Sequence, residues 1–204
     1  MTAPKVKICG LRRAEDIDFA NALRPDLVGF VFAPGSRRRV TQEEALALKR
    51  RLDPGIKAAG VFVGASPEAI AAVVASGAID AVQLHGPDGD EERIAALRAL
   101  VPGVPLVRAL KVRDADDLAA AEASSADLVL LDAGAGDGVP FDWRLLAERP
   151  LRRPFFLAGG LTPDNIAEAI RLARPCGVDA SSGVETGGFK DFAKMRQFIT
   201  EARK

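Results

Sequence analysis

Short apolar, β-branched segments alternate along this chain with longer segments rich in Ala, Leu, Glu and Arg. The short segments have the composition of strands buried in a parallel sheet, and the longer ones have that of helices packed on such a sheet. Strands are expected at residues 6–9, 27–32, 58–63, 81–84, 106–110, 128–131, 155–158 and 178–180. Helices are expected at residues 15–23, 42–52, 67–76, 90–100, 114–123, 143–148, 163–173 and 191–202. The alternation predicts an α/β fold.

Several of the expected helices begin with residues suited to a helix start. Ser66-Pro67 and Thr162-Pro163 each place a capping hydroxyl before a first-turn proline. Thr41, followed three residues later by a glutamate, has the pattern of a capping box. These signals support the helix starts assigned from composition.

Eight strand–helix units in one chain predict a closed barrel. An open doubly wound sheet is the alternative, but such sheets usually have about five or six strands. Roughly 25 residues per unit is close to the shortest that a barrel allows, so the loops must be short. A chain of 204 residues could form two small domains, but no shift of composition and no linker marks a boundary. We therefore predict a single (β/α)8 TIM barrel over residues 1–204.

The charge and cysteine content disfavour several classes of protein. Lys plus Arg and Asp plus Glu both number 28, so no net charge draws the chain to nucleic acid or to an anionic membrane surface. No apolar run approaches the roughly 18 residues that span a bilayer, and the first residues carry no apolar signal region. The two cysteines lie far apart, which favours a reducing compartment over a disulfide framework. We expect a cytoplasmic protein that binds neither nucleic acid nor membrane.

Cys9 closes the first expected strand, immediately before Gly10. Parallel barrels keep their chemistry at the carboxyl ends of the strands, and strand alternation turns Lys7 and Cys9 inward while Val6 and Ile8 face the helices. A lysine one step below a thiol is expected to lower the pKa of the thiol and favour the thiolate. The rim position and the neighbouring lysine favour a reactive thiol over a structural cysteine packed in the core.

Asp132 closes the sixth expected strand and shares a face with Leu128 and Leu130. A carboxyl group above leucines is partly removed from water, which raises its pKa and keeps a proton available for donation. The alternative is that Asp132 caps the following loop through backbone amides. A carboxyl and the Cys9 thiol that face each other across a barrel rim predict a general acid and a general base.

Two loops containing glycine follow the last two expected strands. Gly159 and Gly160 come after the seventh strand, and Ser181, Ser182 and Gly183 come after the eighth. Glycines let backbone amides approach an anion closely, and barrels often bind phosphate at these two loops. Either loop alone could be a simple turn, but the pair in consecutive units predicts a phosphate site.

Other polar residues are expected near the same rim. The three arginines at residues 37–39 follow the second strand and could pair with a carboxylate or phosphate, although a solvated basic loop is the alternative. His85, the single histidine, shares an inward face with Gln83 and could orient a substrate, transfer a proton or stabilise its loop. Asp179 also points inward, where it could position a ligand or pair with Lys7. With one histidine and no Cys-x-x-Cys motif, a zinc site is not expected.

Eight short motifs follow one another from end to end of the chain. They are residues 7–10 (KICG), 29–32 (GFVF), 60–63 (GVFV), 83–86 (QLHG), 130–132 (LLD), 141–143 (FDW), 157–161 (LAGGL) and 177–185 (GVDASSGVE). In sequence and in order they resemble the motifs of the phosphoribosylanthranilate isomerase family. Each motif alone has little specificity, but the ordered set is highly specific.

The resemblance implies an Amadori rearrangement of N-(5-phospho-β-D-ribosyl)anthranilate to 1-(2-carboxyphenylamino)-1-deoxy-D-ribulose 5-phosphate, a step of L-tryptophan biosynthesis. In that family the residue matching Asp132 protonates the furanose ring oxygen, and the residue matching Cys9 removes the proton from C2 of the opened sugar. The resemblance also implies that Arg38 binds the anthranilate carboxylate and that loops 159–160 and 181–183 bind the phosphate. It implies no metal and no organic cofactor. The fold is compatible with a monomer or a homodimer.

Two loops depart from the family pattern. The arginine loop usually reads Ser-Pro-Arg-Tyr, whereas Arg37 and Arg39 flank Arg38 here, so the sequence does not identify which arginine contacts the substrate. The loop after the sixth strand usually carries Gly-Gly-Thr-Gly, whereas Asp137 stands at the position of the threonine. We expect Asp137 to point to solvent, away from the substrate phosphate.

Other functions stay open at this point. A ribulose-phosphate epimerase would require a set of metal-binding histidines, which one histidine cannot supply. An indole-glycerol-phosphate synthase would require a Lys/Glu pair, for which Lys7 and Lys111 are the inward lysines. A binding protein that kept the phosphate site but lost activity is disfavoured by the presence of both Cys9 and Asp132.

Overall fold

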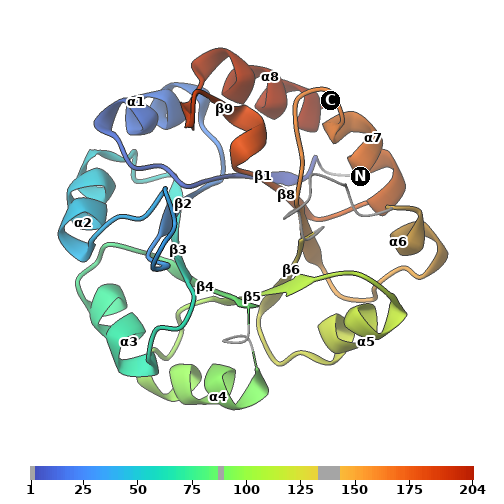
Figure 1. Cartoon of the computed structure of the whole chain (residues 1–204), viewed down its shortest axis with the longest axis horizontal. Coiled ribbons are helices and arrows are strands. Elements are labelled where there is room, and N and C mark those ends of the chain that lie inside the picture. The colour runs from blue at the N-terminus through green and yellow to red at the C-terminus, as the bar shows by residue number, and fades with distance from the viewer. Residues whose placement is uncertain (1–2, 87–89, 133–142) are drawn as a thin grey trace.

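A computed structural model describes residues 3–86, 90–132 and 143–204 of the chain. Within these ranges eight parallel strands close into a barrel, each hydrogen-bonded to the next and β8 to β1. The strands are β1 (Lys5–Cys9), β2 (Leu27–Val31), β3 (Lys57–Phe62), β4 (Ala81–His85), β5 (Leu106–Lys111), β6 (Leu128–Asp132), β7 (Phe155–Ala158) and β8 (Gly177–Ala180). Figure 1 shows the ring of strands with the helices around it. The predicted (β/α)8 TIM barrel is confirmed, and the alternative of an open sheet is excluded.

A helix follows each strand of the barrel. The helices are α1 (Ala14–Leu23), α2 (Gln42–Arg51), α3 (Pro67–Ala75), α4 (Glu91–Leu100), α5 (Ala115–Ala123), α6 (Arg144–Glu148), α7 (Ile166–Ala173) and α8 (Phe192–Ala202), and a 3₁₀ turn, η2 (Ser182–Val184), follows β8. Apart from the start of α7, strand and helix ends lie within one residue of the expected positions. The capping box at Thr41 and the cap at Ser66 are both present.

Helix α7 begins at Ile166, later than the Thr162-Pro163 signal predicted. Residues 163–165 form a turn instead. The Asn165 side chain accepts a hydrogen bond from Thr162 N at 2.8 Å and donates one to Gly160 O at 2.9 Å. Thr162 O also accepts from Asn165 N and Ile166 N at 3.3 and 3.1 Å, so residues 163–165 form a turn that the Asn165 side chain holds in place, and the helix starts after it.

Alternating residues of the strands face two different environments. Val6 and Ile8 are fully buried in the large core between the barrel and the helices, as predicted. A smaller apolar cluster lies apart from that core: Val107, Ala109, Leu130, Phe156 and Ala158. Lys7, Gln83 and Asp179, which alternate with outward-facing residues, are polar and almost fully buried. Buried polar groups of this kind need partners, and they point to a site inside the barrel.

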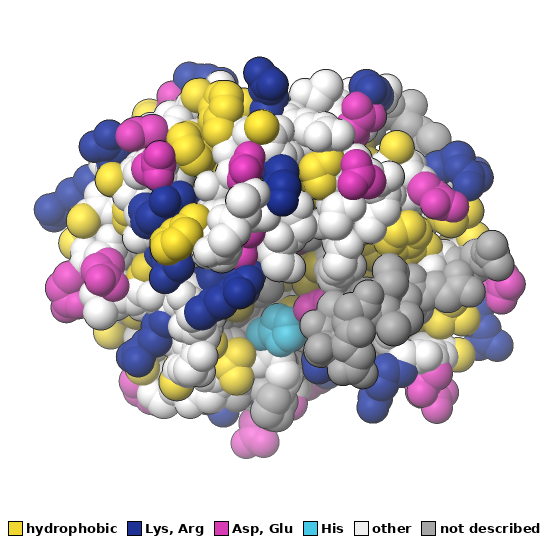
Figure 2. Space-filling view, turned by 45° about the horizontal axis from the view of Figure 1, so that its top comes forward, with side chains coloured by type: hydrophobic (Ala, Val, Ile, Leu, Met, Phe, Trp, Pro, Cys, Tyr) yellow, Lys and Arg dark blue, Asp and Glu magenta, His cyan; other side chains and the backbone are white. Residues whose placement is uncertain are grey.

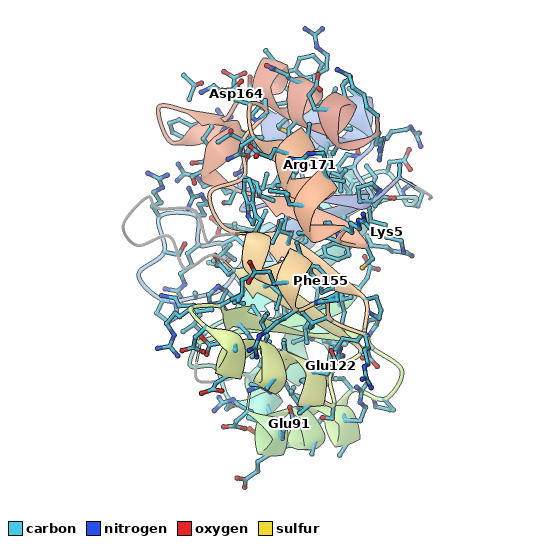
Figure 3. All side chains as sticks on the ribbon, turned by 90° about the vertical axis from the view of Figure 1, so that its right-hand side faces the viewer. Lys5, Glu91, Glu122, Phe155, Asp164 and Arg171 are labelled. Atoms are coloured by element: carbon cyan, nitrogen blue, oxygen red, sulfur yellow. The ribbon has the colours of Figure 1, made fainter. Side chains whose placement is uncertain are left out.

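The helices form the outer layer of the molecule. Figure 3 shows the barrel from the side, with Glu122 of α5 and Arg171 of α7 on the surface. Acidic and basic side chains are interspersed on the face drawn in Figure 2, in keeping with their equal numbers. Within the described residues, no helix combines the length and the apolar character needed to cross a membrane.

Candidate active site

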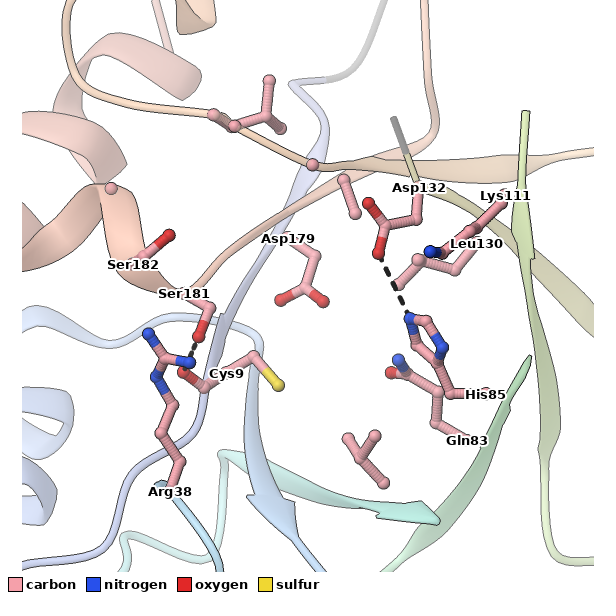
Figure 4. Close-up of a pocket in the computed structure, with 16 residues that line it drawn as sticks. Cys9, Arg38, Gln83, His85, Lys111, Leu130, Asp132, Asp179, Ser181 and Ser182 are labelled. Atoms are coloured by element: carbon pink, nitrogen blue, oxygen red, sulfur yellow. Dashed lines mark hydrogen bonds and ion pairs between the residues drawn. The ribbon is translucent and has the colours of Figure 1, made fainter. Parts of the chain in front are cut away.

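A cavity of about 440 Å³ opens at the carboxyl ends of the barrel strands. It is lined by Cys9, Arg38, Val61, Gln83, His85, Lys111, Leu130, Asp132, Ala158, Gly159, Gly160, Leu161, Asp179, Ser181, Ser182 and Gly183. Every residue that the sequence predicted for the site is among them (Figure 4). The barrel therefore brings the predicted residues together, while the part that each takes in a reaction stays a prediction.

Cys9 ends β1 and lines the cavity. Its neighbour in the β1–β2 register is Gly29, where a Cβ would lie 2.7 Å from Cys9 Sγ, so glycine leaves room for the thiol. Burial raises the pKa of the Cys9 thiol; the Lys7 cation opposes this increase and the Asp179 carboxylate adds to it. Lys7 thus lowers this pKa as expected, but the expectation that the thiolate would be favoured is wrong, because burial and Asp179 outweigh the lysine.

Lys7 and Asp179 form an ion pair inside the barrel, as one of the sequence interpretations proposed. Lys7 Nζ donates to Asp179 Oδ2 at 2.9 Å, and the two side chains are only 3% and 8% exposed. Burial alone would lower the pKa of Lys7, but the Asp179 carboxylate outweighs it and raises this pKa. The second oxygen, Asp179 Oδ1, is buried and has no hydrogen-bond partner among the described residues. Because Asp179 lines the cavity, Oδ1 can accept a hydrogen bond from a bound molecule.

Asp132 ends β6 and His85 ends β4, and their side chains meet on one side of the cavity (Figure 4). His85 Nε2 lies 3.2 Å from Asp132 Oδ2, and both side chains are about one-quarter exposed, at 27% and 23%. A protonated Asp132 donates to a neutral imidazole nitrogen, whereas an ionised Asp132 accepts from an imidazole N–H. The pair is therefore suited to hold a proton at the cavity wall. The predicted elevation of the Asp132 pKa stays a prediction.

Arg38 is the arginine of the 37–39 loop that lines the cavity. Its side chain is 18% exposed, whereas that of Arg37 is 60% exposed. Arg38 Nε and Nη2 donate to the two carboxylate oxygens of Glu185, at 2.6 and 2.8 Å. Burial raises the pKa of Glu185, but hydrogen bonds from Arg38 and Lys190 outweigh burial and lower it to about 2. Glu185 is therefore ionised at neutral pH, and it holds the Arg38 guanidinium at the cavity wall.

The loops after β7 and β8 form one continuous wall of the cavity. Gly159 and Gly160 adopt φ values of +86° and +66°, which favour glycine. A Cβ at Gly183 would lie 2.0 Å from a backbone oxygen of the loop after β7, so only glycine permits this approach. Ser181 Oγ donates to Cys9 O at 3.1 Å, which ties the second loop to β1. A cavity wall made of glycine-containing backbone suits the binding of an anion, which agrees with the predicted phosphate site.

A short hairpin after β8 was not predicted from the sequence. It consists of β9 (Glu185–Thr186) and β10 (Phe189–Lys190), joined by Gly187-Gly188. Lys190 is almost fully buried, and its Nζ donates to Glu185 Oε1 at 2.7 Å and to Ser181 O at 2.9 Å. A Gly-Gly dipeptide with positive φ at both positions is typical of two-residue hairpin turns. That signal could have located the hairpin.

Gln83 and Lys111 are polar residues that line the cavity and were not assigned to the predicted isomerase site. Gln83, on the inward face of β4 below His85, is almost fully buried, and Lys111 ends β5 beside Asp132. In the part of the chain that the structure describes, no group of three or more His, Cys, Asp or Glu side chains is placed to hold a metal ion. Asp137 and the rest of the loop at 133–140 lie outside the described residues, so its predicted orientation stays a prediction.

Comparison with known proteins gives one consistent result. The family model described as N-(5'phosphoribosyl)anthranilate (PRA) isomerase matches residues 6–201. An N-(5'-phosphoribosyl)anthranilate isomerase of Caldanaerobacter subterraneus is 43% identical over 204 residues, which cover 98% of each chain. The corresponding protein of Acetivibrio thermocellus is 42% identical over 210 residues, covering 98% of this chain and 95% of that protein.

Solved structures agree with the sequence relatives. Phosphoribosyl anthranilate isomerase from Thermotoga maritima superimposes with a TM-score of 0.86 at 37% identity, covering 98% of both chains. A complex of such an isomerase with reduced 1-(o-carboxyphenylamino)-1-deoxyribulose 5-phosphate has a TM-score of 0.85 at 37% identity and the same coverage. A further Thermotoga maritima structure, 36% identical, with a TM-score of 0.84 and 98% of both chains covered, is described as monomers generated from a dimeric isomerase.

Proposed function

The chain belongs to the N-(5'-phosphoribosyl)anthranilate isomerase family and is an isomerase of tryptophan biosynthesis, and on that premise we propose that Asp132 is its general acid and Cys9 its general base. The substrate is N-(5-phospho-β-D-ribosyl)anthranilate, and the product is 1-(2-carboxyphenylamino)-1-deoxy-D-ribulose 5-phosphate. Substrate and product are isomers, so the chemistry consists of proton transfers and of breaking one ring bond. Acid and base side chains can supply these steps, and the proposed scheme uses no metal and no organic cofactor.

Ring opening is the first step of the proposed reaction. Asp132 gives its proton to the furanose ring oxygen as the bond from that oxygen to C1 breaks and the nitrogen lone pair forms a C1=N double bond. His85, at 3.2 Å from the carboxyl group, holds Asp132 toward the cavity and can donate a hydrogen bond to the carboxylate that the step leaves. The step leaves an open-chain protonated Schiff base and an ionised Asp132.

Proton removal from C2 is the second step. The Cys9 thiolate takes this proton, and the electrons of the C–H bond form a C1=C2 double bond while nitrogen regains its lone pair. Burial raises the pKa of Cys9, so a smaller fraction is ionised at neutral pH, but each thiolate is a stronger base. The product of this step is an enolamine. It becomes the ketone when C1 gains a proton and the C2 hydroxyl loses one.

Binding of the substrate uses the two kinds of anion-binding group in the cavity, an arginine and the glycine loops. The anthranilate carboxylate pairs with Arg38, and the phosphate lies against the loops containing Gly159, Gly160, Ser182 and Gly183. Between them, Asp179 Oδ1 accepts a hydrogen bond from a sugar hydroxyl, because this oxygen is buried in the cavity wall and bonds to no described residue. Burial raises the pKa of Asp179 and the Lys7 cation opposes this rise; in the ionised form that pairs with Lys7, the carboxylate can only accept hydrogen bonds.

One observation carries this proposal. Cys9, Asp132, Arg38 and the two glycine loops converge on one cavity inside a barrel whose relatives catalyse the isomerisation. The test is a coupled assay in which the upstream transferase makes phosphoribosylanthranilate from anthranilate and phosphoribosyl pyrophosphate. The decay of substrate fluorescence is then followed after adding this protein.

The wild-type chain should abolish the fluorescence signal, whereas Cys9→Ala and Asp132→Asn should leave it nearly unchanged. A signal that persists with folded wild-type protein would overturn the proposed activity. Equal turnover by wild type and either variant would overturn the role assigned to that residue. The arrangement of residues 1–204 as one domain, the choice between monomer and homodimer, and the cytoplasmic location stay predictions. Analytical ultracentrifugation tests the oligomeric state.

A further inference from the structure

We propose that Glu185 is a positioning residue that presents Arg38 to the carboxylate of the substrate and thereby sets the preference for a carboxylated aromatic amine. The inference rests on the proposed role of Arg38, and it goes beyond it by assigning a function to the hairpin after β8. Its evidence is the set of contacts around the Glu185 carboxylate.

Glu185 binds Arg38 by a bidentate contact. Nε and Nη2 of Arg38 donate to Oε1 and Oε2 of Glu185 at 2.6 and 2.8 Å. Two parallel bonds determine the plane of a guanidinium group as well as its position. They engage one edge of the group, and among the described residues Nη1 has no recorded hydrogen bond, which leaves that nitrogen for a ligand in the cavity.

Glu185 is itself held firmly in place. Its side chain is 4% exposed, and Lys190 Nζ donates to Oε1 at 2.7 Å. Lys194 Nζ donates to the Glu185 backbone oxygen at 2.8 Å, and Arg37 Nη2 donates to Oε2 at 3.0 Å. A carboxylate with this many donors cannot rotate away without losing several charge-assisted bonds. Glu185 is therefore a rigid support that holds the Arg38 guanidinium in place.

The hairpin that carries Glu185 is anchored to the loop after β1. The guanidinium groups of Arg12 and Arg13 lie 4.7 and 4.6 Å from the centre of the Phe189 ring. Arg12 and Arg13 also donate to backbone oxygens of Gly188 and Lys190, at 3.4 and 3.3 Å. Cation–π contacts of this kind stabilise a partly exposed aromatic ring. The hairpin thus joins the β1 loop, which follows Cys9, to the loop that carries Arg38.

Arg38 also fits closely against the β1 loop. A Cβ at Gly10 would lie 2.4 Å from Arg38 Cδ, and Gly10 has a φ of +83°. Glycine at this position therefore lets the Arg38 stem cross the end of β1 on its way to Glu185. The side chain is confined on one side by Gly10 and at its tip by Glu185, so its direction into the cavity is determined before a substrate arrives.

The charges around Glu185 do not cancel. One carboxylate faces three cations, Arg37, Arg38 and Lys190. The cluster keeps a positive excess that attracts an anionic group, and the geometry directs that attraction through Arg38. A substrate without the carboxylate gains nothing from this arrangement. The cluster should therefore discriminate between ligands that differ only in that group.

The test measures binding of two stable probes by calorimetry. One is reduced 1-(o-carboxyphenylamino)-1-deoxyribulose 5-phosphate, and the other is its phenylamino counterpart, which lacks the carboxylate. In the wild type the carboxylated probe should bind at least about 30-fold more tightly. Glu185→Gln should reduce this ratio by about tenfold while leaving the affinity for the phenylamino probe within about twofold. Arg38→Ala should abolish the preference, and adding Glu185→Gln to it should change nothing further.

Arg39→Ala is the matched control, because it removes an exposed arginine of the same loop that has no part in the Glu185 contacts. It should leave the ratio within about twofold of wild type. If Glu185→Gln weakens the binding of both probes equally, Glu185 is only structural and the inference is wrong. If it weakens the binding of neither probe, Arg38 does not depend on Glu185 and the inference is also wrong. An unchanged preference in Arg38→Ala would instead overturn the proposed carboxylate site. Turnover by the wild type in the fluorescence assay tests the activity separately.

Discussion

His85 Nε2 lies 3.2 Å from Asp132 Oδ2 and joins the carboxyl ends of β4 and β6 at the cavity wall. The two strands are not neighbours in the barrel, since β5 separates them. The contact therefore depends on strand ends that converge on one rim. It places the proposed acid beside the chain's single histidine, which can form a hydrogen bond with it.

Asp132→Asn should lower kcat by about 100-fold to 10,000-fold, the range in which a general acid contributes. The amide keeps the shape of the carboxyl group but has no acidic proton, so affinity for reduced 1-(o-carboxyphenylamino)-1-deoxyribulose 5-phosphate should change by less than about threefold. Stopped-flow fluorescence gives kcat, and calorimetry gives the dissociation constant. A loss of affinity as large as the loss of kcat would show that Asp132 mainly binds the substrate.

Cys9 should govern the alkaline dependence of the reaction. Burial raises the pKa of its thiol, so the thiolate fraction at neutral pH is small and grows as pH rises. The value of kcat/KM should therefore increase by about tenfold per pH unit from neutral pH up to an apparent pKa above the ordinary value for cysteine. In Cys9→Ala, kcat should fall by at least about 100-fold, and kcat/KM should no longer increase with pH in this range.

Cys176→Ala is the control for the cysteine experiment, because Cys176 is exposed and immediately precedes β8, at the opposite end of that strand from the cavity. It should leave both kcat and the pH profile unchanged. A pH profile that is flat in the wild type would contradict the role of Cys9 as base.

Lys7→Met should destabilise the fold, because it leaves the Asp179 carboxylate buried without its cation. Breaking a buried ion pair from one side costs about 3–5 kcal/mol in the free energy of unfolding, which urea titration at neutral pH would measure. The double variant Lys7→Met/Asp179→Leu should be more stable than Lys7→Met, since it removes both charges. Additive losses in the double variant would show that the two residues do not act as a pair.

Glu185 should contribute stability that disappears in acid. Its pKa is lowered from an ordinary value of 4.5 to about 2, so the contribution is complete above pH 4.5 and is lost as pH falls toward 2. At pH 7 this shift corresponds to at most about 3 kcal/mol. Urea unfolding should give a higher free energy of unfolding for wild type than for Glu185→Gln at pH 7. This difference in free energy should narrow below pH 4.5. A difference that stays constant down to pH 3 would contradict the assigned ionisation.

Gly183→Ala should weaken phosphate binding, because its Cβ would lie 2.0 Å from a backbone oxygen of the loop after β7 and the two loops would separate. KM for the substrate and the inhibition constant of inorganic phosphate should both rise by about tenfold or more. Gly177→Ala is the matched control at the other end of β8, where the Cβ would lie 2.3 Å from the Phe156 ring. It should lower the melting temperature without changing the inhibition constant of phosphate.

Several features of the site could be predicted because they follow from local rules. Cys9 and Asp132 each end an apolar run, and strand alternation is enough to turn them toward the barrel interior. The inward Lys7 and Asp179 follow from the same rule. The hairpin at residues 185–190 was missed although its Gly-Gly turn is a local signal, and the late start of α7 was missed because residues 163–165 form a turn that the Asn165 side chain holds in place.

The sequence by itself determined the alternation of strands and helices, the inward residues of each strand and the family resemblance, because each depends on residues that are near one another in the chain. Only the tertiary structure showed which of three arginines lines the cavity: Arg37 and Arg38 both contact Glu185, about 147 positions away, but only Arg38 makes two bonds to it and is largely buried at the cavity wall. It also decided the direction of the Cys9 pKa, because burial and the charge of Asp179 are sums over distant segments. Long-range contacts and desolvation exist only after the barrel closes, and for that reason they cannot be read from neighbouring residues.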